Sequence, residues 1–323
     1  MKTFDTSTGK PAVLIMGPTA SGKTDLVLRL ARERPIDIIS VDSAMVYRGM
    51  DIGTGKPPRD VLERYPHRLV DILDPSQAYS AGQFVRDATR AIEESHRNAR
   101  LPVLVGGTML YFRALRHGLA EMPSADPAVR DQLDREAAER GWPALHDELA
   151  RIDPTAAARI RPNDAQRIQR ALEVFRLTGK TLSELHASPQ PPAPDLRFIA
   201  YAWVPSDRQR LHAAIENRFA SMMNAGLLDE VRALHARADL HADLPAIRSV
   251  GYRQLWEHLQ GDIPLERAAE RAIFATRQLA RRQLMWLRAE TEVSWIDPLE
   301  STADAQILRG IDSVLDERRT RPE

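Results

Sequence analysis

The stretch AVLIMGPTASGKT, residues 12–24, determines the fold that we predict for this chain. Its first five residues form an apolar run typical of a buried strand, and GPTASGKT matches the phosphate-loop pattern G-x-x-x-x-G-K-[ST] in full. Glycines let the backbone wrap around an anion, and the N–H groups that open the following helix point toward it. Lys23 adds a positive charge, and the Thr24 hydroxyl can ligate Mg²⁺. The motif therefore identifies a polyphosphate ligand, but it does not identify a reaction.

Outside this loop, short apolar runs alternate with helical patterns. IDIIS at 36–40, HRLVDI at 67–72 and PVLVGG at 102–107 have the character of strands that are buried on both faces. Helices are expected at 24–33 and 80–97, between these runs. This order predicts an α/β fold with a doubly wound parallel sheet.

The pattern changes near residue 119. From there to about 187 we find helical segments and no convincing strand, and the proline-rich stretch SPQPPAPD at 188–195 closes this region. A strand-like run, RFIAYAWV, then returns at 197–204. We therefore predict a phosphate-loop core at 1–118 and 197–323, with a helical insertion at 119–196 hinged at 122–127 and 188–195. Two independent domains in series are the alternative.

The C-terminal third is expected to be mostly helical. Asp207 can cap a helix that ends near Gly226, and a longer helix is expected at 265–288. VSWID at 293–297 predicts a last strand.

Composition excludes several classes of protein. The chain has 323 residues, of which 43% are hydrophobic and 28% are charged, so it can bury a substantial core. Basic and acidic residues number 45 each, so a surface for a polyanion must be local. The absence of cysteine excludes disulfides and thiolate chemistry. No apolar stretch is long enough to span a membrane, and we expect a cytoplasmic protein without a membrane partner.

A phosphate loop belongs most often to ATP-dependent enzymes. These enzymes also need an acidic metal ligand after a strand, and Asp42, which follows IISV, is a candidate. An ATP-dependent small-molecule kinase therefore stays open as an interpretation. A non-catalytic RNA-binding module is a third one, but it would leave the phosphate loop without a role.

Longer motifs go beyond these general patterns. They are DSAMVYRGMDIGTGKP (42–57), PHRLVDI (66–72), DPSQAYSAGQF (74–84), VLVGGTMLYFRAL (103–115), LAEMPSADP (119–127), RPNDAQRIQRALEV (161–174), LPAIRSVGYRQLW (244–256) and ATRQLARRQLMWLR (275–288). Together with GPTASGKT, they make the chain resemble the tRNA dimethylallyltransferase family, bacterial isopentenyl transferases that modify adenosine 37 of the anticodon loop. The resemblance extends from Ala12 to about Asp297.

This resemblance implies a specific use of the phosphate loop. It would bind the diphosphate of dimethylallyl diphosphate rather than ATP, through Gly17, Pro18, Thr19, Ala20, Ser21, Gly22, Lys23 and Thr24. The dimethylallyl group would move to N6 of adenosine 37, with Mg²⁺ as cofactor at Thr24. The helical insertion would grip the anticodon stem-loop of the tRNA partner, and we expect a monomer.

Four residues are expected to be catalytic: Asp42, Thr19, Lys23 and Arg218. A carboxylate such as Asp42 can accept the N6 proton, because the N6 lone pair is delocalised and the amine is a weak nucleophile. A metal ligand or a local cap is the alternative for this residue. Thr19 and Lys23 would stabilise the leaving pyrophosphate.

Arg218 is supported by helical spacing as well as by the resemblance. It lies on the same helical face as Leu211, Ile215 and Met222, so it needs an anion unless its side chain extends back to solvent. The resemblance places the diphosphate there.

Basic residues predict where RNA binds. Residues 159–180 contain six basic side chains against two acidic ones, and Arg277, Arg281 and Arg288 form one helical stripe. A solvated helix face is the alternative for any such stripe. With the resemblance, the residues expected to contact tRNA are Asp42, Ser43, Ala44, Met45, Thr108, Arg130, Gln166, Arg167, Ile168, Gln169, Arg170, Ile247, Arg248, Ser249, Val250, Gly251, Tyr252, Arg277, Arg281, Arg282 and Gln283. Many members of the family have Gln where this chain has Met45, which lacks the hydrogen bonds of an amide.

Overall fold

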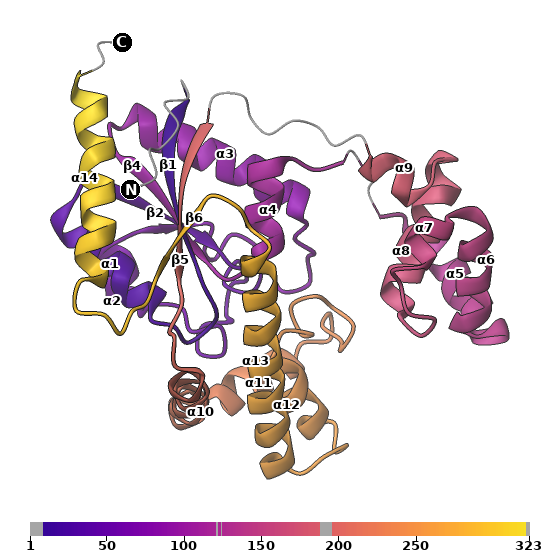
Figure 1. Ribbon diagram of the computed structural model, residues 1–323. Coiled ribbons are helices and arrows are strands. Elements are labelled where there is room, and N and C mark those ends of the chain that lie inside the picture. Colours follow the sequence, from indigo (N-terminus) through magenta and orange to yellow (C-terminus); the bar gives the residue numbers. More distant parts are fainter. Residues whose placement is uncertain (1–8, 121, 124, 188–195, 321–323) are drawn as a thin grey trace. The chain divides into compact units, whose positions relative to one another are not determined.

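A six-stranded parallel sheet forms the centre of the fold (Figure 1). The computed structural model describes residues 9–120, 122–123, 125–187 and 196–320. The strands are β1 (Lys10–Met16), β2 (Ile36–Val41), β3 (His67–Arg68), β4 (Leu101–Gly106), β5 (Leu196–Trp203) and β6 (Val293–Ile296), in the spatial order β3-β2-β4-β1-β5-β6. Every neighbouring pair is parallel, and β1 is central, with Val13 opposite Val103 on one side and Ile199 on the other. The prediction of an α/β fold with a parallel sheet is confirmed.

Helices cover both faces of this sheet. The helices α1 (Lys23–Glu33) and α14 (Ala303–Thr320) share one apolar core with the strands, in which Leu26, Ile307 and Ile311 contact residues such as Val13 and Ile199. The opposite face is covered by α3 (Ala81–Arg97), whose N-terminus is closed by a capping box between Ser80 and Gln83. Figure 1 shows α1 and α14 together on one side of the strands.

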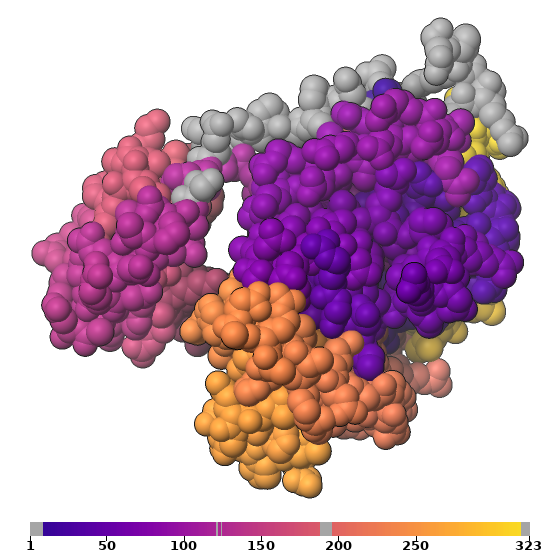
Figure 2. All heavy atoms as spheres, turned by 180° about the vertical axis from the view of Figure 1, so that it is seen from behind, coloured from indigo at the N-terminus to yellow at the C-terminus, as the bar shows by residue number. Residues whose placement is uncertain are grey.

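A second apolar core lies beside the sheet. It joins the loop after β2, through Val46, Tyr47 and Met50, to the helices α11 (Leu227–His235), α12 (Tyr252–Leu259) and α13 (Leu265–Arg288). Figure 2 shows the orange surface of the region after α10 (Arg208–Asn224) lying against the purple surface of the N-terminal half. The loop after β2 is therefore fixed by helices that are far away in the sequence.

One strand is much shorter than expected. HRLVDI at 67–72 was expected to form a strand, but β3 contains only His67 and Arg68. Leu69 and Asp71 have φ angles of 65° and 56°, and backbone in this left-handed region cannot continue a ladder. The expectation was wrong because an apolar run does not reveal where the chain turns. The short helix α2 (Arg59–Arg64) precedes this strand.

The chain divides into two compact units, one formed by Met1–Arg113 and Pro194–Glu323 and the other by Ala114–Ala193. The helix α4 (Met109–His117) spans the first junction. The second unit contains α5 (Pro127–Arg140), α6 (Trp142–Ile152), α7 (Pro154–Ala157), α8 (Ala165–Thr178) and α9 (Leu182–His186). These helices surround their own core, which includes Leu133, Leu145 and Leu172. The expected hinge at 188–195 lies outside the described residues, as does Ser124 within the expected hinge at 122–127.

Within residues 9–120, 122–123, 125–187 and 196–320, no helix is both long enough and apolar enough to cross a bilayer.

Candidate active site

The phosphate loop connects the end of β1 to the start of α1. Gly22 has a φ of 82° and directly precedes the helix, so the loop turns tightly and the first N–H groups of α1 face the loop. The loop is also held from outside, because the Trp203 indole donates a hydrogen bond of 2.9 Å to the Ser21 carbonyl. A Cβ at Gly17 would lie 2.3 Å from the Trp203 carbonyl oxygen, which excludes any larger residue there. The sequence context predicted for the motif, a strand followed by a helix, is therefore observed.

Two cations converge on this loop. The Lys23 ammonium lies across its own loop and donates to the Pro18 carbonyl at 2.6 Å. Burial, together with the nearby Arg218 guanidinium, lowers the pKa of Lys23 to about 7, and Asp42 opposes this shift. Burial also lowers the pKa of Arg218, while Asp42 and Asp25 oppose the shift. A bound polyanion would offset the cost of holding both charges here.

Arg218 occupies the position that helical spacing predicted. It lies on α10 between the buried Ile215 and the partly buried Met222, and its guanidinium donates to the Thr54 carbonyl at 3.1 Å. The backbone approaches closely at this point, since a Cβ at Gly55 would lie 2.0 Å from Arg218 Nη2. The guanidinium therefore has a fixed position beside the loop at 50–56.

Asp42 lies just beyond the carboxyl end of β2, where ligand sites of parallel sheets occur. Its Oδ1 accepts hydrogen bonds from the backbone N–H groups of Ala44 at 2.8 Å and Met45 at 3.1 Å. Asp42 therefore also caps the local backbone, as the alternative interpretation predicted. Both contacts also orient the carboxylate, which lines two cavities of the core unit.

These two cavities have volumes of about 500 and 550 Å³. The larger is lined by the phosphate loop, and the other by residues 43–44, 108–110 and 248–252 with Arg282 and Trp286. Six residues line both: Thr19, Asp42, Thr54, Gly107, Arg218 and Gln283. The anion-binding loop and the second cavity therefore meet at a common wall that contains three of the four expected catalytic residues.

Gln283 has a role within the protein that the sequence did not suggest. Its amide oxygen accepts from the Thr19 N–H at 2.9 Å, and its amide nitrogen donates to the Gly107 carbonyl at 2.9 Å. We expected this residue at the tRNA, but here both ends of the amide bind the protein itself. Thr108 is used in a related way, since its hydroxyl accepts from the Ser43 N–H at 3.1 Å.

The other expected tRNA contacts are divided among several surfaces. Ser43, Ala44, Arg248, Tyr252 and Arg282 line the second cavity, as do Ser249, Val250 and Gly251. Met45 lines the phosphate-loop cavity. The side chains of Ile168 and Ile247 are fully buried in hydrophobic cores, so they are not available to contact RNA. Both side chains contribute to apolar packing inside the protein rather than to a surface for RNA.

The arginine stripe of α13 lines a third cavity of about 410 Å³. Arg277, Arg281 and Arg288 meet Arg208 and His212 of α10 there. Arg277 is also paired with Glu216. Burial and the positive charges of Arg277 and Arg208 lower the pKa of His212. This concentration of arginine is suited to a nucleic-acid phosphate.

In the helical unit, two of the expected tRNA contacts are engaged in a buried cluster. The carboxylate of Glu173, which is 0% exposed, binds Arg130 at 2.8 Å and Arg170 at 2.7 Å. These bonds hold the pKa of Glu173 below its ordinary value, although burial opposes them. Arg167 is different, because its side chain is 70% exposed. Its Nε lies 3.6 Å from Asp164 Oδ2. Gln169 donates to Asp134 at 2.7 Å, and Gln166 lies in the first turn of α8.

The site also fits the expected Mg²⁺ ion. The phosphate-loop cavity offers the hard oxygen donors of Thr24, Ser40 and Asp42. No group of three or more acidic or histidine side chains suited to a metal is found in the part of the chain that the structure describes. Mg²⁺ commonly binds through one or two protein oxygens together with substrate phosphates, and this arrangement matches that mode.

Comparisons with known proteins agree with this geometry. The family model described as "IPP transferase" matches residues 45–290, and "Isopentenyl transferase" matches residues 11–71. The tRNA dimethylallyltransferase of Alkalilimnicola ehrlichii is 57% identical over 291 residues, which cover 89% of this chain and 91% of that protein.

Solved structures are similar as well. A full-length tRNA isopentenylpyrophosphate transferase from Bacillus halodurans is 36% identical, with a TM-score of 0.69 and coverage of 96% of this chain and 98% of that one. A eukaryotic dimethylallyltransferase acting on tRNA is 26% identical, with a TM-score of 0.77 and coverage of 97% and 80%.

Proposed function

Because this chain belongs to the tRNA dimethylallyltransferase family, we propose that it transfers the dimethylallyl group of dimethylallyl diphosphate to N6 of adenosine 37 in tRNA. The single observation that carries the assignment to this site is the wall that the two cavities share, where Asp42, Thr19 and Arg218 lie together. A diphosphate on one side and a base on the other would meet there. The matching relatives are prenyl transferases, so the kinase interpretation is set aside.

In the proposed reaction, the diphosphate occupies the phosphate loop. The Lys23 ammonium, the Arg218 guanidinium and the N–H groups that open α1 compensate its charge. As the bond between C1 of the dimethylallyl group and the bridging oxygen breaks, the electron pair stays with the pyrophosphate. Positive groups fixed beside that oxygen stabilise the transition state more than the ground state. Thr19 is expected to donate a hydrogen bond near the same oxygen.

Asp42 is the proposed general base. The N6 nitrogen forms its bond to C1 and loses one proton, which the Asp42 carboxylate accepts. The two backbone N–H groups that bind Oδ1 keep the carboxylate aimed from the end of β2. Proton transfer to a positioned general base is worth about 10²–10⁴-fold in rate.

Mg²⁺ would be held by the Thr24 hydroxyl together with the diphosphate. When bound, it neutralises charge on the phosphate oxygens. The phosphate loop, Lys23 and Arg218 bind and orient the diphosphate.

The tRNA must present its base to the second cavity. Adenosine 37 lies in a stacked loop, so it has to leave the stack before N6 can reach Asp42, at a cost of about a few kcal/mol. Arg281 and Arg288 of α13, and Arg167 of the helical unit, are proposed to bind backbone phosphates that offset this cost. We also propose that the protein acts as a monomer.

A labelling experiment tests this proposal. The protein is incubated with an unmodified anticodon stem-loop RNA and either dimethylallyl diphosphate labelled in the dimethylallyl group or ATP labelled in the γ-phosphate. We expect label in the RNA only from the dimethylallyl donor. Replacement of adenosine 37 by guanosine should abolish the transfer. Transfer of phosphate from ATP to any acceptor would support the kinase interpretation instead.

A further inference from the structure

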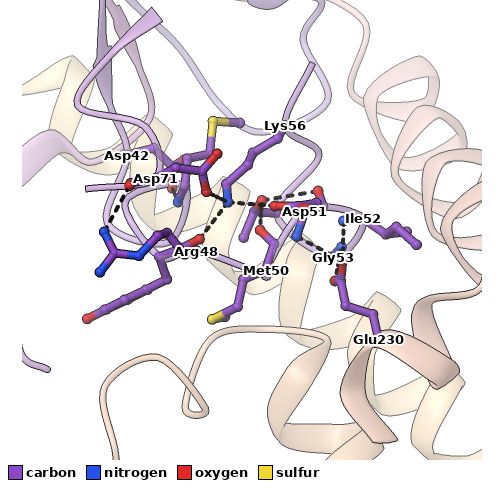
Figure 3. A network of polar contacts seen from close by, with 12 residues as sticks. Asp42, Arg48, Met50, Asp51, Ile52, Gly53, Lys56, Asp71 and Glu230 are labelled. Carbon is purple, nitrogen blue, oxygen red and sulfur yellow. Dashed lines mark hydrogen bonds and ion pairs between the residues drawn. The ribbon is translucent and has the colours of Figure 1, made fainter. Parts of the chain in front are cut away.

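We propose that Glu230 is a positioning residue for the transfer reaction, and that it acts by holding the loop at 50–56 against Arg218. This inference rests on the proposed function. Glu230 lies in the first turn of α11 and was not among the residues expected to form the site. Figure 3 shows its carboxylate facing the backbone of this loop, beside the Lys56 network.

The carboxylate of Glu230 has four hydrogen-bond donors. The backbone N–H groups of Asp51 and Ile52 each bind Oε2 at 2.8 Å, and the N–H of Gly53 binds Oε1 at 3.1 Å. The Tyr252 hydroxyl donates to Oε1 at 2.6 Å. Burial and the neighbouring Glu230 carboxylate raise the pKa of Tyr252, so its hydroxyl remains a donor. One side chain therefore satisfies three successive backbone groups that belong to neither helix nor strand.

The other end of the loop is also fixed. The Lys56 ammonium, on a side chain that is only 2% exposed, binds the Tyr47 carbonyl, Asp51 and Asp71 (Figure 3). Between these two anchors lies Thr54, whose hydroxyl donates to the Met50 carbonyl at 2.7 Å. The loop is therefore anchored by Glu230 and by Lys56, with Thr54 between the two anchors.

This segment carries the contact that matters for the site. The Thr54 carbonyl accepts from Arg218 Nη2 at 3.1 Å, and Thr54 lines both cavities. Gly53 packs against Tyr252 so closely that a Cβ would lie 2.6 Å from the ring. A loop released from Glu230 would displace the carbonyl that orients Arg218.

A substitution that removes the charge separates positioning from folding. In Glu230→Gln, an amide group must face some of the four donors, and an N–H cannot accept from a backbone N–H. We expect the single-turnover transfer rate to fall about tenfold and KM for dimethylallyl diphosphate to rise. The Kd for the stem-loop RNA should stay within about twofold, because phosphate contacts dominate that affinity. Asp229→Asn is the matched control, since Asp229 is the neighbouring carboxylate and pairs only with Arg232 in the described structure.

A double-mutant cycle with Arg218→Ala tests the route of the effect. If Glu230 acts through Arg218, adding Glu230→Gln to Arg218→Ala should cost less than about twofold more. A full tenfold further loss would overturn the proposal, as would a Glu230→Gln enzyme with the wild-type rate. If circular dichroism shows that the Glu230→Gln variant does not fold, the cycle is repeated with Glu230→Asp. This variant keeps the charge and shortens the side chain. Its expected loss is about threefold, and it too should not add to Arg218→Ala. The wild-type enzyme in the same assay reports on the proposed function separately.

Discussion

The side chain of Gln283 accepts a hydrogen bond from the backbone N–H of Thr19 at 2.9 Å, and this contact joins helix α13 to the phosphate loop. The same amide donates to the Gly107 carbonyl, so it also connects the loop to the end of β4. Helix α13 carries the arginines that line the third cavity. Gln283 therefore links a proposed RNA-binding helix to the proposed diphosphate site within one side chain.

Replacing Gln283 tests which substrate this residue serves. We expect Gln283→Ala to weaken binding of dimethylallyl diphosphate by about tenfold, because the partly buried Thr19 N–H and the buried Gly107 carbonyl lose their partners. Calorimetry measures this affinity, and Gln278→Ala on the same helix is the control. A variant that loses only RNA affinity would assign Gln283 to the tRNA instead.

Removal of the Asp42 carboxylate tests the general base. Asp42→Ala should lower kcat by about 10²–10⁴-fold, while the Kd for stem-loop RNA stays nearly unchanged. Rapid-quench kinetics with saturating substrates gives kcat, and filter binding gives Kd. A kcat within about threefold of the wild type would exclude Asp42 from this role.

The protonation of Lys23 predicts a pH dependence of diphosphate binding. The pKa of Lys23 is about 7 in the free protein, so the amine is charged below this pH and largely neutral above it. A bound diphosphate favours the charged amine and raises this pKa. Binding above pH 7 must therefore take up a proton, and the affinity should fall as pH rises from 7.5 to 9.

Calorimetry in buffers of different ionisation enthalpy measures this proton uptake directly. Lys23→Arg is the control, because a guanidinium stays charged throughout this range and its affinity should not change with pH. Equal pH dependence in both proteins would contradict the assignment to Lys23.

Two arginines are expected to act on different substrates. Arg218→Ala should reduce the transfer rate and weaken the binding of the diphosphate, with little change in RNA affinity. Arg281→Ala should weaken the binding of RNA. It should also reduce the slope of log K against the logarithm of the salt concentration by about one unit. Titrations of fluorescent stem-loop RNA between 50 and 200 mM salt, which span about tenfold or more in affinity, resolve this difference. An Arg218→Ala protein that changes only RNA binding would refute our assignment.

The helical unit is predicted to serve the tRNA alone. Its core, which includes Leu133 and Leu145, shares no residue with the core around the sheet. A variant in which residues 120–195 are replaced by a short Gly/Ser linker should therefore fold and bind dimethylallyl diphosphate with nearly the wild-type affinity. It should lose most of its transfer to stem-loop RNA. Near-normal transfer by this folded variant would show that the unit has no part in RNA binding.

The sequence by itself determined the phosphate loop, the parallel α/β fold and the positions of α10 and α13. These features depend on neighbouring residues: the loop is eight consecutive residues after a strand, and Asp207 caps α10 with its own side chain. Helical spacing was also sufficient to predict that Arg218 lies beside Ile215 and Met222. Local rules suffice here because the interacting groups are within about two helical turns of each other.

Only the tertiary structure decided how the site is held together. Gln283 meets Thr19 across 264 positions of sequence, and Glu230 meets Asp51 across 179. Glu173 looked like one of two acids on a basic surface, yet it is buried and engages Arg130 and Arg170. In each case a polar side chain has found its partner because parallel strand ends and packed helices bring distant segments together. Burial makes an unpaired polar group costly, so each buried polar side chain must have a partner. The spacing of residues along the chain does not reveal which partner that is.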